Sequence, residues 1–102
     1  MAEVRVIAKF VARKGEEDQL RALLQGMLTP TRAEPGCKLY ELYESDSTGR
    51  FYFYETWESQ AALHQHTAMP HFKHLEQTSR ELLKEPFEVN ILKTILTDAA
   101  RA

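Results

Sequence analysis

The sequence predicts a single α+β domain with the element order strand, helix, strand, strand, helix, strand, which is the split βαβ or ferredoxin-like arrangement. Its 102 residues, 43% of them hydrophobic and 27% charged, suit one globular core. Four segments have the alternation or the composition of β-strands, and two others repeat apolar residues at helical spacing. This order predicts a four-stranded antiparallel sheet with both helices on one face. We expect the domain to span residues 1–97, followed by a loose tail over residues 98–102.

The first third of the chain predicts a strand and then a helix. Residues 3–13 alternate apolar and polar side chains, as in a strand with two unlike faces. Gly15 breaks the pattern, and residues 16–18 are acidic, which favours a helix start. Apolar residues then recur at helical spacing, at Leu20, Leu23, Leu24, Met27 and Leu28. We expect Gly26 and Pro30 to bend or fray the second half of this helix, and Glu34-Pro35-Gly36 to end it.

Residues 37–44 and 50–57 predict two further strands that pair antiparallel across the short polar connection 45–49. Ser59 is a suitable N-cap for a helix over residues 60–67. Pro70 then stands where a first helical position tolerates proline, so we expect a second helical run to about residue 84. The last strand is expected over residues 87–96.

The expected third strand is aromatic on both of its faces, whereas one face of an antiparallel sheet is usually polar. Seven of the ten aromatic residues belong to the hairpin that contains it, namely Tyr40, Tyr43, Phe51, Tyr52, Phe53, Tyr54 and Trp57. A lone monomer rarely exposes so much ring area. We therefore expect a homodimer in which a second copy covers the open face, sheet against sheet.

Charge and cysteine content exclude several classes of protein. The formal net charge is −2 and basic residues are scattered among acidic ones, so we expect no nucleic acid or membrane partner. The RNA-recognition motif shares this element order, but the first strand lacks a central stacking ring. The single cysteine, Cys37, allows neither an internal disulfide nor a CxxC zinc site. With no signal-peptide profile at residue 1 and no membrane-length apolar run, we expect a cytoplasmic protein.

Helical geometry predicts which of the four histidines face the core and which face solvent. His66 follows Ala62 by four positions and Leu63 by three, so it is expected to face the sheet. His71 lies at the edge of the next apolar stripe, while His64 and His74 fall outside. An inward His66 with Glu55 as its carboxylate partner could act as a general base. The alternative is a hydrogen-bonded core histidine, with Glu55 paired to a nearby Arg or Lys.

Two other groups of residues could form a metal site or a ligand-binding slot. His71 and His74 are three apart and could share a metal ion, but no facing carboxylate has a recognisable spacing, so we expect no metal. A flat apolar slot for a planar aromatic ligand could be lined by Tyr40, Tyr52, Tyr54 and Trp57. The alternative is that these rings form the core and a dimer interface.

Several of these residues occur in an order that resembles the motif of a known protein family. Glu55, Trp57, His66 and Pro70-His71-Phe72, with Glu34-Pro35-Gly36-Cys37 upstream, resemble the antibiotic biosynthesis monooxygenase family over residues 4–96. The resemblance implies a small dimeric α+β barrel, and members include quinol monooxygenases that act without metal or flavin. The segment 50–55 followed by His66 and Pro70-His71 is also similar to the bacterial phospho-autoinducer isomerase, a member of the family that is not an oxygenase. Haem-degrading oxygenases share the barrel, but their tryptophan-and-histidine helix pattern is missing here.

The leading hypothesis is a monooxygenase that uses no cofactor and acts on a quinol or phenolic small molecule with molecular oxygen. His66, oriented by Glu55, would remove a phenolic proton, and His71 and Phe72 would join the aromatic residues of the slot in binding the substrate. One alternative is an isomerase of a small phosphorylated hydroxy-ketone, using the same base. Another is a dimer that binds a small molecule without catalysis.

Overall fold

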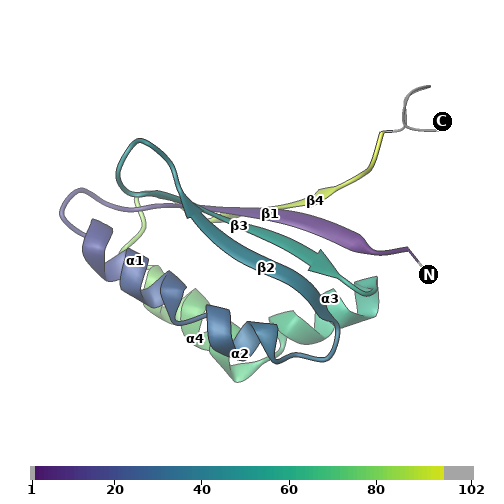
Figure 1. Ribbon diagram of the computed structural model, residues 1–102. Coiled ribbons are helices and arrows are strands. Elements are labelled where there is room, and N and C mark those ends of the chain that lie inside the picture. Colours follow the sequence, from purple (N-terminus) through teal and green to yellow (C-terminus); the bar gives the residue numbers. More distant parts are fainter. Residues whose placement is uncertain (1, 96–102) are drawn as a thin grey trace.

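The computed structural model describes residues 2–95. Its elements in chain order are β1 (Val4–Val11), α1 (Glu17–Gln25), α2 (Leu28–Arg32), β2 (Cys37–Glu44), β3 (Arg50–Trp57), α3 (Gln60–Thr67), α4 (Pro70–Ser79) and β4 (Glu88–Leu92). The strands form one antiparallel sheet in the order β2-β3-β1-β4. All four helices lie against one face of the sheet, and no other part of residues 2–95 covers the opposite face (Figure 1). The predicted α+β, ferredoxin-like class is confirmed.

Side-chain alternation in the two central strands separates a packed face from an open one. On β3, Phe51, Phe53 and Trp57 are each at most 1% exposed beneath the helices. Tyr52 and Tyr54 alternate with them and are half-buried on the opposite face. The packed face of β1 contributes Val6, Ala8 and Phe10 to the same core. The expectation that β3 presents rings in two directions is therefore confirmed.

The first predicted helix is interrupted where its sequence suggested. Helix α1 ends at Gln25, α2 begins at Leu28, and Gly26 forms the cap between them. Leu20 and Leu24 on α1 are fully buried against the sheet. The apolar stripe thus anchors α1, and the break lets the chain turn toward the loop that carries Glu34.

The predicted last helix and last strand both extend beyond the observed elements. Helix α4 ends at Ser79 rather than near residue 84, because a turn in which the Leu82 and Leu83 N–H groups donate to the Ser79 carbonyl leads the chain to the end of β1. The Arg13 N–H donates to the Leu82 carbonyl and the Lys84 N–H to the Val11 carbonyl, each at 2.8 to 2.9 Å. Strand β4 ends at Leu92, opposite Arg5, where its pairing with β1 stops. Residues 96–102, including the expected tail, lie outside the described residues.

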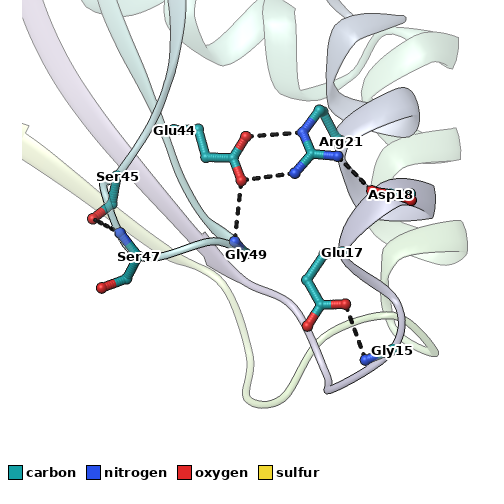
Figure 2. A network of polar contacts seen from close by, with 8 residues as sticks. All are labelled: Gly15, Glu17, Asp18, Arg21, Glu44, Ser45, Ser47 and Gly49. Atoms are coloured by element: carbon teal, nitrogen blue, oxygen red, sulfur yellow. Dashed lines mark hydrogen bonds and ion pairs between the residues drawn. The ribbon is translucent and has the colours of Figure 1, made fainter.

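An ionic contact fixes α1 to the β2–β3 hairpin. The Arg21 guanidinium donates to both oxygens of Glu44 at 2.8 Å and to Asp18 at 2.7 Å (Figure 2). The Gly49 N–H donates to the same Glu44 carboxylate at 3.2 Å. These donors lower the pKa of Glu44 to about 2. The contact joins helix and hairpin at the end of the sheet remote from the histidines.

No helix among residues 2–95 is long and apolar enough to cross a membrane.

Candidate functional site

The site is built around His66, which enters the core from α3. Ser59 caps this helix by accepting a hydrogen bond from the Ala62 N–H at 3.1 Å. His66 is 2% exposed, which confirms that it points inward. Its ring centroid lies 4.6 Å from that of Trp57, 5.1 Å from Phe72 and 5.9 Å from Tyr40. Three aromatic side chains therefore hold the imidazole in place.

The carboxylate partner of His66 is Glu34, not the predicted Glu55. The distance from His66 Nδ1 to Glu34 Oε2 is 2.7 Å, and His71 Nε2 approaches the same oxygen at 2.7 Å. The side chains of Glu34 and His66 are only 4% and 3% exposed, and that of His71 is 21% exposed. Glu34 comes from the loop after α2, His66 from α3 and His71 from α4. We call these three residues the Glu34–His66–His71 cluster.

Backbone contacts around α2 and α3 place Glu34. The Glu34 N–H donates to the Thr31 carbonyl, and the Cys37 N–H donates to the Glu34 carbonyl. Two residues on, a Cβ on Gly36 would stand 2.3 Å from the Ala62 Cβ, so only glycine lets the loop approach α3 this closely. Since Ala62 and His66 are one turn apart on α3, this close approach brings Glu34 within reach of the imidazole.

With Glu34 Oε2 as the acceptor, His66 donates through Nδ1 and retains a lone pair on Nε2. Burial lowers the pKa of His66, and the hydrogen bond to Glu34 opposes that effect. The imidazole is thus held neutral, in one tautomer, with one nitrogen able to accept a proton.

Glu55 has a different role in the site. Its Oε1 accepts a hydrogen bond from the Trp57 indole N–H at 2.8 Å, and the residue is 5% exposed. Burial raises the pKa of Glu55 to about 7, the Trp57 hydrogen bond acts in the opposite direction, and the nearby Glu34 raises it further. Because an indole N–H only donates, the proton of a neutral Glu55 belongs on Oε2. The carboxyl can then donate a hydrogen bond of its own.

A small apolar cavity of about 40 Å³ lies between the sheet and the helices. Glu55 and His66 line it together with Tyr40, Phe72, Phe87 and Val89, among others. A cavity of about 150 Å³ is the size that holds benzene. A ring could enter only if lining side chains moved, and the outermost are Phe87 and the half-exposed Val89 of the edge strand β4. The larger surface hollow at the end of α4, about 500 Å³, contains none of the cluster.

The predicted aromatic slot is divided between two faces. Tyr40 lines the cavity and Trp57 stacks beside His66, whereas Tyr52 and Tyr54 lie on the open face and cannot reach the cavity. Phe72 lines the cavity as expected. His71 turns to Glu34 rather than to the cavity. His64 and His74 are exposed. The suggested His71–His74 pair is not formed, because His71 contacts Glu34 whereas the nearest polar partner of His74 is Thr78, at 3.4 Å.

Sequence reasoning missed Glu34 as a site residue. Its segment was expected to end the first helix and formed part of the family resemblance, but no role in the site was assigned to it, and 32 positions separate it from His66. The usable signal was Gly36, because a glycine that follows a helix can mark a close approach of two backbones as well as a turn.

Comparisons with known proteins agree on one family. The family model described as antibiotic biosynthesis monooxygenase matches residues 3–78. Rv0793 of Mycobacterium tuberculosis, provisionally named a monooxygenase, is 44% identical over 89 residues, which are 87% of this chain and 88% of that protein. Its solved structure superposes with a TM-score of 0.88 at 40% identity, covering 95% of this chain and 99% of that one.

Two further solved structures are similar. SO0527 of Shewanella oneidensis gives a TM-score of 0.83 at 33% identity and covers 88% of each chain. PA3566 of Pseudomonas aeruginosa gives 0.87 at 28% identity and covers 94% of this chain and 97% of that one. The likeness therefore extends over nearly the whole chain.

Proposed function

The chain belongs to the antibiotic biosynthesis monooxygenase family, and from this premise we propose that it oxygenates a phenolic or quinol small molecule without a metal or flavin cofactor. The observation that carries the proposal is the buried His66, which lines an apolar cavity and whose Nδ1 is held by Glu34 at 2.7 Å, so that Nε2 keeps its lone pair. Relatives named as monooxygenases support the reaction class. The substrate class rests on what this arrangement can do chemically.

Triplet dioxygen reacts slowly with a substrate whose electrons are all paired, so the substrate itself must be made electron-rich. His66 would accept the proton of a phenolic hydroxyl at Nε2, and Glu34 would stabilise the resulting imidazolium. The phenolate would then supply all four electrons that reduce dioxygen. One oxygen atom would end as a carbonyl on a ring carbon. The other would leave as water, which takes one hydrogen from that carbon and the hydrogen of the phenolic hydroxyl.

Glu55 complements this base. With its pKa raised to about 7 and Oε1 occupied by Trp57, the neutral carboxyl would donate from Oε2 to an oxygen of the bound ring. Apolar cavity walls such as Phe72 and Phe87 would exclude water from the reduced intermediates. A base and a neutral acid would thus face one ligand.

The same acid and base pair favours a second candidate function, the isomerisation of a small hydroxy-ketone by enolisation. His66 would take a proton from one carbon while Glu55 hydrogen-bonds the carbonyl. Of the described residues that line the cavity, none is a lysine or arginine, so a phosphate group would have to lie outside it. This speaks against a phosphorylated substrate inside the cavity.

We also propose that the protein is a homodimer through the open sheet face. That face carries Tyr52 and Tyr54 on β3 and Ile7 on β1, and it has both basic and acidic side chains, including Lys9 and Glu41. A two-fold interface needs a self-complementary surface of this kind.

Oxygen uptake tests the proposed function. Quinols and phenolic ketones would first be screened by thermal shift, and each hit followed with an oxygen electrode. We expect uptake of one dioxygen per substrate, and His66→Ala to lower the rate by about 100-fold or more while the fold is retained. The exposed His64→Ala serves as the control and should retain the full rate. Full turnover without oxygen would establish the isomerase instead, and unchanged activity of His66→Ala would refute the base.

A further inference from the structure

Three metal-ligating groups converge at one buried point. His66 Nδ1 and His71 Nε2 each lie 2.7 Å from Glu34 Oε2, and all three atoms lie within 4.8 Å of one another. They come from three segments of the chain, so their convergence is a property of the tertiary structure rather than of local helical spacing. Ionisable side chains are rarely gathered in a core unless they bind one another or a ligand.

The spacing of these atoms is close to that of a zinc coordination sphere. Zinc binds imidazole nitrogen and carboxylate oxygen at about 2.0 to 2.2 Å, which places ligands of a tetrahedral ion about 3.3 Å apart. Both nitrogen to oxygen distances are 2.7 Å, and the nitrogens are separated by no more than 4.8 Å. Opening each short distance by about half an ångström would admit the ion.

We propose that Glu34, His66 and His71 form a binding site for one divalent transition cation of the zinc class. Two imidazole nitrogens and one carboxylate oxygen match the ligand preference of zinc and cobalt(II), and a small fourth ligand such as water would complete the tetrahedron. His71 is the most exposed member at 21% and provides the route of entry.

Cation binding and base catalysis exclude each other at His66. In the metal-free cluster the imidazole hydrogens lie on His66 Nδ1 and His71 Nε2, between nitrogen and Glu34. A cation would take those two positions, and each imidazole, to remain neutral, would carry its hydrogen on the other nitrogen. His66 Nε2 then becomes an N–H donor with no lone pair for a substrate proton. Resting on the proposed function, this makes the cation an inhibitor.

The binding test needs no substrate. Full-length protein freed of metal by chelation would be titrated with zinc by calorimetry, and with cobalt(II) while the visible absorption of tetrahedral cobalt is recorded. We expect one ion per chain, with affinity at least tenfold lower in His71→Asn and in Glu34→Gln. His74→Asn, an exposed histidine on the same helix α4, is the matched control and should bind as the wild type does.

His71→Asn is the decisive variant because His71 is only partly buried and its loss leaves the core intact. Thermal unfolding would confirm that each variant is folded. The site is refuted if the wild type gives no tetrahedral cobalt spectrum, or if His71→Asn and Glu34→Gln bind as tightly as the wild type.

Oxygen uptake separates the two proposals. If the wild type binds zinc and zinc abolishes uptake that EDTA restores, both stand. If zinc binds but no substrate consumes oxygen, the proposed function fails and the cation site stands on its calorimetric result. If the cation raises oxygen uptake, the site stands, while the metal-free mechanism and the inhibitory role both fail.

Discussion

Two acidic residues of the site differ in what surrounds their oxygens, and this difference decides what each can do. Glu34 accepts hydrogen bonds from two imidazoles on one oxygen, which fixes the orientation of both rings. Glu55 has one neutral indole donor in an apolar setting, and burial raises its pKa to about 7. One carboxylate therefore serves to orient, and the other remains a proton carrier near neutral pH.

The raised pKa of Glu55 predicts a pH-dependent stability. A carboxyl whose folded-state pKa lies above its ordinary value of 4.5 binds more protons folded than unfolded, so it makes stability fall as pH rises from about 4.5 through 7. Glu55→Gln keeps the shape and removes this titration. We expect the free energy of unfolding of Glu55→Gln relative to wild type to increase between pH 4.5 and pH 8, by on the order of 3 kcal/mol at most.

Urea unfolding at a series of pH values measures this difference. Both proteins share every other titrating group, so the difference between them isolates Glu55. The exposed Glu58→Gln, one carboxylate fewer on the surface, is measured beside it as the control. A flat difference for Glu55→Gln would show that Glu55 is ionised in the folded protein at neutral pH.

The inward direction of His66 could be predicted from helical spacing alone. Residues three and four positions apart share one side of a helix, and His66 shares a side with Ala62 and Leu63. The partner of His66 could not be predicted in the same way. Glu55 was the nearest carboxylate in the expected sheet, whereas Glu34 reaches the imidazole through a loop whose path depends on packing between α2, α3 and β2. A pairing across 32 positions has no local sequence signal.

At the scale of elements, regular segments were predictable and their ends were less so. The bounds of β2, β3 and α3 coincide with the expected ranges, since each is delimited by turn or capping residues such as Gly49 and Ser59. The end of α4 is set instead by a turn that leads the chain to β1, and the end of β4 by its pairing with β1. The hydrophobic periodicity of a segment does not indicate which of its backbone groups will bond to another element.

The contact between Gly36 and α3 gives a prediction at this scale. In Gly36→Ala the new methyl would stand 2.3 Å from the Ala62 Cβ, so the loop must retreat from α3 and carry Glu34 away from His66. We expect a loss of stability of about 2 kcal/mol, as for other overpacked contacts, and at least a tenfold loss of oxygen uptake.

Chemical denaturation and the oxygen electrode would measure both effects. Gly26→Ala is the matched control, because Gly26 has a helical φ of −64° and its added Cβ would meet nothing closer than 3.3 Å. It should be as stable as the wild type and as active. If Gly36→Ala also behaved as the wild type does, the close approach of the loop to α3 would not be what positions Glu34.

At the scale of the whole molecule, one layer of helices covers one face of the sheet, and residues 2–95 leave the opposite face without cover (Figure 1). Strand β4 is exposed along its whole length: Val89 at 50% and Ile91 at 57% pair with Ala8 and Val6 and so lie on the helix side of the sheet, while Leu92 at 39% pairs with Arg5 on the open face. The packed core therefore accounts for one face only. Apolar exposure on this scale is typical of a surface that meets another protein.

This asymmetry predicts a dimer that a single charge can weaken. Analytical ultracentrifugation at micromolar concentration should give twice the chain mass for the wild type. Ile7→Lys, at the centre of the open face between Arg5 and Lys9, should shift the equilibrium toward single chains because the interface would then bury an unpaired charge. Gln77→Lys on the exposed side of α4 is the control and should leave the mass unchanged. A wild type that sediments as single chains contradicts the assembly.

Strand β4 also bears on how the protein must be handled. It is the last strand of the sheet, so its outer backbone groups have no neighbour within the described part of the chain, and its apolar side chains flank that free edge. Edges of this type template the growth of fibrils when nothing shields them. Single chains released by dilution or mutation should therefore stay in solution at micromolar concentration but precipitate when they are concentrated. Losses during concentration would then report on broken assembly before they report on unfolding.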